Sequence, residues 1–258
     1  MNMQEIAVYV LTLAEIVGVP AYIMLRNSME KNNAKPTVTY SKRRIIRLLL
    51  VNFVLNSLVA LWSLFMLTNL DNMNFFQSIE GMLYFLIYAS ALLCTYYGNG
   101  MYIASITIEA YFWHSKPDPH SNGYKALKHF HGPISHLIIH TSWLVVLLGL
   151  ASLDGLAGIR ENLNWIPLTI AGSCVGVGHA LSQFYSKTAK YQFITGFLCL
   201  ISFFMIFQSM DFSVRKTVYG SFFAGTIITY CLILGLWPIV KRIGRSLRFI
   251  IGIFDWRE

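Results

Sequence analysis

Seven long apolar runs constrain this chain of 258 residues more than any other feature. They cover approximately residues 5–26, 45–70, 79–112, 130–153, 165–186, 190–210 and 216–241. The hydrocarbon core of a bilayer is about 30 Å thick, and about 20 helical residues span it. Because backbone groups in lipid must hydrogen-bond within their own segment, each run predicts a transmembrane helix. The third run is too long for one perpendicular crossing and is expected to tilt or protrude.

The composition supports this interpretation. Only 12% of the residues are charged and 55% are hydrophobic, whereas about a quarter of a soluble domain is charged. This excludes a disordered chain, a nucleic-acid-binding domain and almost any soluble enzyme. We predict an all-α membrane protein, a seven-transmembrane helix bundle forming a single domain over residues 1–258. The N-terminal MNMQEIAVYV has no basic region, so no cleavable targeting peptide is expected.

The basic residues predict the direction of every crossing. Alternate connections hold seventeen Lys and Arg residues on one side and three on the other. Since basic loops stay on the cytosolic or matrix side, the N-terminus is predicted outside and the C-terminus inside. The net charge of +8 is then largely explained by topology and by contact with lipid headgroups. The inner-face tail, residues 242–258, alternates basic and apolar residues and is expected to lie in the interface.

Several chemistries are absent from the sequence or weakly indicated. The four cysteines lie inside apolar runs without a CxxC pair, which indicates small buried side chains and neither a zinc site nor a disulfide framework. The segment GSCVGVG at 172–178 is rich in small residues and predicts close helix packing. Lys216 and Lys241 lie at the ends of the last helix, which disfavours a retinal Schiff base.

Ionisable residues inside the spans are the candidate functional groups, because charge is costly in lipid. Glu15 and Glu109 are two such carboxylates. Glu15 is expected to be protonated or paired, and Glu109, near the inner end of its helix, to reach a headgroup. The sharper signal is HFHGPISHLIIH, in which His136 and His140 are four residues apart and share one helix face. His129 and His131, in the same stretch, are expected at the inner interface.

His140 and His179 raise the question of a haem. A haem iron held by two imidazoles needs histidines on facing helices at matching depth. These two lie roughly 15 and 10 Å from the inner ends of their helices, at 1.5 Å per residue. A single b-type haem is therefore an alternative, and hydrogen-bonded histidines inside a bundle are the favoured interpretation. No metal-ligand set is predicted otherwise.

The second half of the chain resembles a known family. The segment DFSVRKTVYGSFFAGT at 211–226 is similar to the D-G-[IV]-YGS-x-FF-x-x-T segment of subunit III of cytochrome c oxidase, with one residue fewer between Ser221 and the two Phe residues. The resemblance extends over about residues 97–243. Other positions that match family motifs, some of them loosely, are Gln208, Asp211–Phe212, Tyr219, Gly220, His120–Ser121, Leu127–Lys128, Gly132 and His179.

Three departures from the family matter. The family's last helix is missing after residue 241, and the first helix of this chain is extra. In the same register the family's buried carboxylate falls on His140, so carbodiimide-type reactivity is not expected here.

The resemblance implies a non-redox subunit of a terminal haem–copper oxidase in the respiratory chain. Such a subunit has no catalytic centre, stabilises the catalytic subunit and supports proton and oxygen access. It would lie in the mitochondrial inner membrane or a bacterial cytoplasmic membrane, with other oxidase subunits, membrane lipids and no nucleic acid as partners. The resemblance also implies bound phospholipid, such as cardiolipin, in a cleft between helix groups.

The same resemblance assigns roles to particular residues. His120, Lys125 and Lys128 are the candidates for lipid headgroup phosphate at the inner face, while Tyr219 and Ser221 would hold the opposite end. His136, His140 and His179 are the intramembrane polar candidates, and we expect His140 and His179 to form interhelical hydrogen bonds. Two alternatives stay open: a b-type haem cytochrome using His140 and His179, and a seven-helix receptor or transporter.

Overall fold

The structure is a computed structural model with helices and turns in its described part. It describes residues 2–33, 61–62, 65–68, 70, 76–112, 118, 120–158, 160–209 and 213–236. Within these ranges most of the backbone is helical and there is no strand. The elements are α1 (Met3–Asn33), α3 (Ile79–Phe112), α4 (Asn122–His129), a π-turn (Phe130–Ile134), α5 (Ser135–Ala157), α6 (Trp165–Ser186), α7 (Ala189–Ser209), a 3-10 turn (Val214–Lys216) and α8 (Val218–Gly235).

Five stretches of the described helices are long and apolar enough to cross a membrane. They are Ile79–Ser105, Asn122–Ala157, Trp165–Phe184, Ala189–Ser209 and Val218–Gly235. By length and composition this is an integral membrane protein. The predicted second helix, 45–70, lies mostly outside the described residues, of which 61–62 and 65–68 are helical. The count of seven crossings and their inside–outside direction stay predictions, and the 242–258 tail lies outside the described residues.

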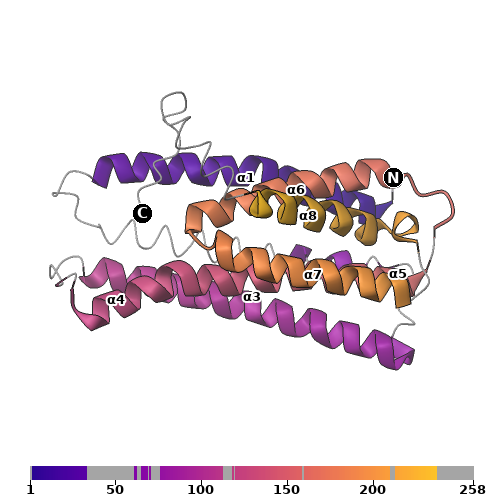
Figure 1. The fold of residues 1–258 in the computed structure, drawn as a ribbon, viewed down its shortest axis with the longest axis horizontal. Helices are drawn as coiled ribbons and strands as arrows, with labels where there is room; N and C mark the ends of the chain where they lie inside the picture. The colour runs from indigo at the N-terminus through magenta and orange to yellow at the C-terminus, as the bar shows by residue number, and fades with distance from the viewer. Residues whose placement is uncertain are drawn as a thin grey trace.

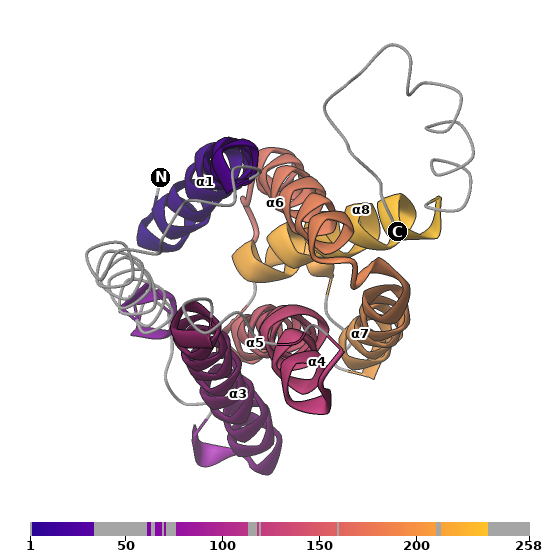
Figure 2. The ribbon, with the colours of Figure 1, turned by 90° about the vertical axis from the view of Figure 1, so that its left-hand side faces the viewer.

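The helices lie roughly along one long axis (Figure 1). Viewed along that axis, α5 is flanked by α3, α7 and α8, α4 continues the α5 helix toward one end, and α1 lies beside α6 (Figure 2). Most of the α8 span is buried, whereas most of the α3 and α7 spans is not. The outer faces of α3 and α7 therefore present apolar side chains to their surroundings, as membrane helices do.

Small residues bring α6 and α8 into backbone contact. A Cβ atom added at Gly172 would lie 1.9 Å from the Phe222 carbonyl oxygen, and one at Gly225 would lie 2.1 Å from the Thr169 carbonyl oxygen. Side chains larger than a hydrogen atom do not fit there, so the two backbones can approach only where glycines meet. The close packing predicted from GSCVGVG is confirmed.

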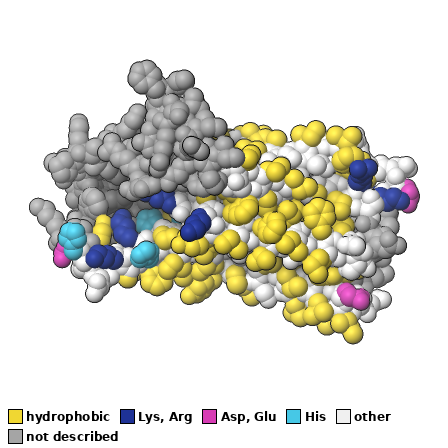
Figure 3. Space-filling model, in the orientation of Figure 1, with side chains coloured by type: hydrophobic (Ala, Val, Ile, Leu, Met, Phe, Trp, Pro, Cys, Tyr) yellow, Lys and Arg dark blue, Asp and Glu magenta, His cyan; other side chains and the backbone are white. Residues whose placement is uncertain are grey.

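The two ends of the bundle differ in composition. The first, which we name the α4 end, carries exposed His120, Lys125 and Lys128 in and before α4. At the other end the α5–α6 and α7–α8 connections meet, where the Arg160 amide donates to the Lys216 carbonyl and Lys216 Nζ lies 3.1 Å from Glu161 Oε1. A largely apolar band separates the charged ends (Figure 3). This is the charge distribution of a membrane-spanning bundle.

Several predicted helix boundaries were wrong. The fourth helix begins eight residues early, at Asn122, because α4, the π-turn and α5 form one continuous helix that ends at Ala157. The first continues to Asn33, past the predicted end at residue 26. The last begins at Val218, after a 3-10 turn that includes Lys216. Apolar runs mark the part of a helix in lipid, and helices extend beyond it.

Candidate functional site

Three histidines follow one face of the helix formed by α4, the π-turn and α5. A π-helix bonds residue i to i+5, so the π-turn Phe130–Ile134 brings His131 and His136, five apart, near one face. His136 and His140, four apart, share that face by α-helical geometry. The sequence placed His131 at the inner interface, and the structure finds it half-buried near the α4 end. The π-turn, which contains Pro133, adds it to the row.

Ring contacts join these residues to α3. The Tyr102 ring lies 5.3 Å from the His131 ring and 5.2 Å from the His136 ring, edge to face in both cases. The His136 and His140 rings are stacked with centroids 5.8 Å apart and planes 11° apart. Three imidazoles and one phenol therefore form an unbroken line of aromatic contacts into the bundle.

The line continues onto α6 and α8. The His140 ring meets the His179 ring edge to face at 4.7 Å, and His179 lies 5.3 Å from the Tyr230 ring. His179 is buried and Tyr230 is completely inaccessible to solvent. His179 Nε2 is buried with no hydrogen-bond partner in the described part of the chain. Buried polar atoms are normally satisfied, so this nitrogen marks a place for a water molecule or a proton-exchanging group.

A polar layer closes the row at Gln192 of α7. The Tyr230 hydroxyl donates to Gln192 Oε1 at 3.1 Å. Gln192 Nε2 donates to Thr141 Oγ1 at 3.2 Å and to the Leu137 carbonyl oxygen at 3.1 Å. One buried amide thus ties α5, α7 and α8 together at the depth of the histidine pair. Gln192 and Tyr230 could not be recognised from the sequence, because a lone Gln or Tyr in an apolar run does not reveal its neighbours.

Beyond this layer the described core is mostly aromatic and aliphatic, and the buried hydroxyls of Ser152 and Thr226 donate to carbonyl oxygens of their own helices. Phe203 lies 4.6 Å from Phe207 and 5.3 Å from Phe223, ring to ring, and all three are buried. Leu144 and Leu147 of α5 fill the same half of the core. Among the described residues, the row of imidazole rings therefore enters the interior from the α4 end and does not continue past this layer.

The histidine pair does not fit a haem in this arrangement. A metal–imidazole bond is about 2 Å long, so iron between two imidazole nitrogens separates the ring centroids by about 6 Å. The His140 and His179 rings are 4.7 Å apart and edge to face, which leaves no room for a macrocycle between them. The prediction that His140 and His179 lie at similar depths in their helices is confirmed, since their rings are in contact. Among the described residues no group of three or more His, Cys, Asp or Glu side chains is placed to hold a metal ion.

A buried carboxylate, Asp154 of α5, lies at the opposite end of the bundle. Asp154 Oδ2 accepts a hydrogen bond of 2.7 Å from the Tyr219 amide, and the Tyr219 hydroxyl donates to the Met66 carbonyl oxygen at 3.0 Å. Asp154 is 3% exposed. The carboxylate on α5 thus accepts a hydrogen bond from a backbone amide in the first turn of α8, where amides have no partner within their own helix. The sequence assigned it to a connection because the apolar run ends at residue 153.

The family-motif positions fold around this end. Tyr219, Gly220 and Ser221 are buried, and the Ser221 hydroxyl donates to the Val214 carbonyl oxygen at 2.9 Å. A Cβ atom at Gly220 would lie 2.1 Å from Thr217 Oγ1. Gln208, by contrast, is exposed at the end of α7. Asp211 lies outside the described residues.

The remaining candidates occupy different surroundings. His120, Lys125 and Lys128 are exposed at the α4 end, and Lys128 Nζ lies 5.5 Å from the Tyr124 ring centre. Glu15 is half-buried on α1, and Glu109 is on α3 with its side chain outside the description. The cysteines were predicted to be buried. Cys199 and Cys231 are buried and Cys174 is half-buried. Cys94 is exposed, so the prediction was wrong for this residue.

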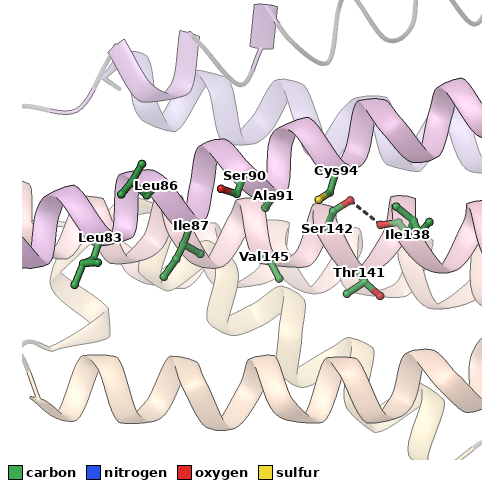
Figure 4. Close-up of a pocket in the computed structure, with 10 residues that line it drawn as sticks. All are labelled: Leu83, Leu86, Ile87, Ser90, Ala91, Cys94, Ile138, Thr141, Ser142 and Val145. Carbon is green, nitrogen blue, oxygen red and sulfur yellow. Dashed lines mark hydrogen bonds between the residues drawn. The ribbon is translucent and has the colours of Figure 1, made fainter.

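An apolar groove of about 570 Å³ runs between α3 and α5 (Figure 4). Leu83, Leu86 and Ile87 of α3 and Val145 of α5 line it. Ser142 lies in the wall, but its hydroxyl already donates to the Ile138 carbonyl oxygen at 2.6 Å. An open apolar groove on a membrane helix pair accommodates a hydrocarbon chain.

The chain matches no protein-family model, no curated protein and no solved structure.

Proposed function

We propose that this chain is a non-redox subunit of a membrane oxidase of the haem–copper type, similar to subunit III of cytochrome c oxidase. In this role it stabilises the catalytic subunit, binds phospholipid and supports access of protons and oxygen in a respiratory membrane. The proposal includes seven crossings, an outer N-terminus and an inner C-terminus. It stands on the sequence resemblance over residues 97–243, and a packing observation supports its non-redox part.

That observation is the direct contact between the rings of His140 and His179. A chain that carried electrons with these two histidines would hold them apart around a macrocycle. Here they pack against each other and against Tyr230, as scaffold side chains do. The proposed subunit therefore leaves electron transfer to its partners.

Two surfaces support the binding of lipid and partner subunits. The outer face of α3 exposes Met82, Leu93 and Tyr97, and that of α7 exposes Phe204 and Met205. We propose that a phospholipid acyl chain occupies the groove between α3 and α5, while His120, Lys125 and Lys128 bind headgroup phosphate at the α4 end.

A native purification tests the proposal. The tagged chain is extracted from its own membrane in mild detergent, and the preparation is studied by mass spectrometry and visible absorption. We expect haem-bearing oxidase subunits in the native complex and no Soret band from the chain expressed alone. A bis-histidine Soret band from the isolated chain would support a b-type cytochrome. Isolation as a solitary chain or homo-oligomer would contradict the oxidase assignment.

A self-contained seven-helix transporter is the second candidate, and the polar row from Tyr102 to Gln192 favours it. Ionisable side chains in the interior of a membrane bundle commonly line ion or proton paths. The same native purification separates this candidate from the first, since a transporter does not co-purify with haem-bearing subunits.

A further inference from the structure

The row of aromatic and imidazole rings has a direction. It begins at half-buried His131 near the α4 end, passes Tyr102, His136 and His140, and ends at fully buried residues. Each ring lies between 4.7 and 5.8 Å from the next as far as Tyr230. On the other side of the Tyr230–Gln192 layer the described core contains no imidazole. Its buried polar groups, on Ser152, Asp154 and Thr226, are hydrogen-bonded to backbone groups. The row of imidazoles therefore opens at the α4 end and stops inside the bundle.

Imidazoles in such a row can pass protons. A neutral imidazole has one nitrogen that donates and one that accepts, so it takes up a proton on one side and releases another from the other side. Imidazole rings with centroids 5.8 and 4.7 Å apart, as in the His136–His140 and His140–His179 pairs, can exchange a proton directly or through one water molecule. Between His131 and His136 lies the Tyr102 ring, which contacts both. The unpartnered Nε2 of His179 provides a position for such a water inside the bundle.

We propose that His131, His136, His140 and His179 form a one-sided proton path, which connects the α4 end of the bundle with the buried Tyr230–Gln192 layer. Tyr102 holds the outer rings in line. No bond other than N–H and O–H changes, and the proton returns by the same path or passes to a partner. The inference goes beyond the proposed function, because it concerns this chain alone and holds with or without oxidase subunits.

Other titratable groups on the neighbouring helices must be considered. They are Cys199 on α7, Cys231 on α8, Cys174 on α6, Glu15 on α1 and Tyr102 on α3. Glu15 lies one turn after Thr12 on α1. The Thr12 hydroxyl is 3.5 Å from the Ala171 carbonyl oxygen of α6. Ala171 lies about two turns before His179 on the same helix. In the described part of the chain Glu15 has no hydrogen-bond or ion-pair partner. It is the most acidic of these groups, so Glu15→Gln is included in the test.

The test measures how fast solvent deuterium reaches the buried rings. The full chain, labelled with ¹⁵N-histidine and assigned through single-histidine variants, is placed in phospholipid nanodiscs and transferred to D₂O. Solid-state NMR then follows the imidazole N–H signals of His140 and His179. We expect the exchange rate of both to fall at least tenfold in His136→Phe, and to stay unchanged in Glu15→Gln and in the control His120→Phe. Unchanged exchange at His179 in His136→Phe would overturn the proposal.

A second variant and a flux measurement complete the test. His131→Phe lies at the half-buried start of the row, where a larger ring disturbs packing least, and it should also slow exchange at His140 and His179. If both variants fold, as judged by circular dichroism, and neither slows exchange, the path does not exist. In proteoliposomes containing a pH-sensitive dye, the wild-type chain should conduct no more protons than His179→Phe. A larger flux through the wild-type chain would refute the one-sided path.

Discussion

The contact between α6 and α8 gives the sharpest stability prediction. In Gly172→Ala, the new Cβ atom would lie 1.9 Å from the Phe222 carbonyl oxygen, whereas real Cβ atoms essentially never approach closer than 3.0 Å. The atom in the way belongs to the backbone, so it cannot rotate aside. The helices must separate by about 1 Å, which also lengthens the 3.2 Å hydrogen bond from the Thr169 hydroxyl to the Ser221 carbonyl oxygen.

The magnitude follows from three effects. Overpacking a close contact costs about 1–3 kcal/mol, and loss of the hydrogen bond costs about 0.5–1.5 kcal/mol. Replacing glycine by alanine inside a helix returns about 1 kcal/mol. We therefore expect Gly172→Ala to lower the free energy of unfolding by about 1–3 kcal/mol.

The assay is unfolding by dodecyl sulfate in mixed micelles, followed by tryptophan fluorescence. Gly100→Ala on α3 is the matched control, because nothing lies within 4 Å of a Cβ atom at that position. It should be neutral or raise stability by up to about 1 kcal/mol. If Gly172→Ala proves as stable as Gly100→Ala, the α6–α8 backbone contact described here is incorrect.

Three further variants test other contacts. Asp154→Ala leaves the buried Tyr219 amide without its acceptor and should lower the unfolding free energy by about 1–3 kcal/mol, while Asp154→Asn, which keeps an acceptor, should lose less; equal losses in the same unfolding assay would contradict this role. Gln192→Leu removes the hydrogen bonds that join α5, α7 and α8 and should cost about 1–3 kcal/mol by that assay, and a neutral result would count against the polar layer. Lys125→Gln combined with Lys128→Gln should weaken retention of anionic lipid, measured by native mass spectrometry, by about 1 kcal/mol per lysine, and unchanged retention would rule out headgroup binding there.

Much of the helical framework could be predicted from the sequence. The apolar runs located the five described membrane-length helices, because burial in lipid demands apolar length. Small residues in GSCVGVG correctly indicated a close helix contact, since only they permit backbones to meet. His136 and His140 were placed on one face by their spacing alone.

The candidate site was only partly predictable. The π-turn at Phe130–Ile134 changed which face His131 occupies, and a period count that assumes a regular α-helix cannot show this. Asp154 was assigned to a connection, although α5 continues past it and buries its carboxylate against α8. The assignment of Asp154 came from equating the helix with its apolar run.

The sequence by itself determined that the chain crosses lipid as helices and that imidazoles lie inside it, because hydrophobic length and residue spacing are local properties. The tertiary structure alone decided that His140 meets His179, that Tyr230 and Gln192 complete the layer, and that the row of rings runs inward from the α4 end. These depend on which helices are neighbours and at what depth they pack. That choice is made by the shapes of all the faces together, including the glycines that let α6 and α8 touch.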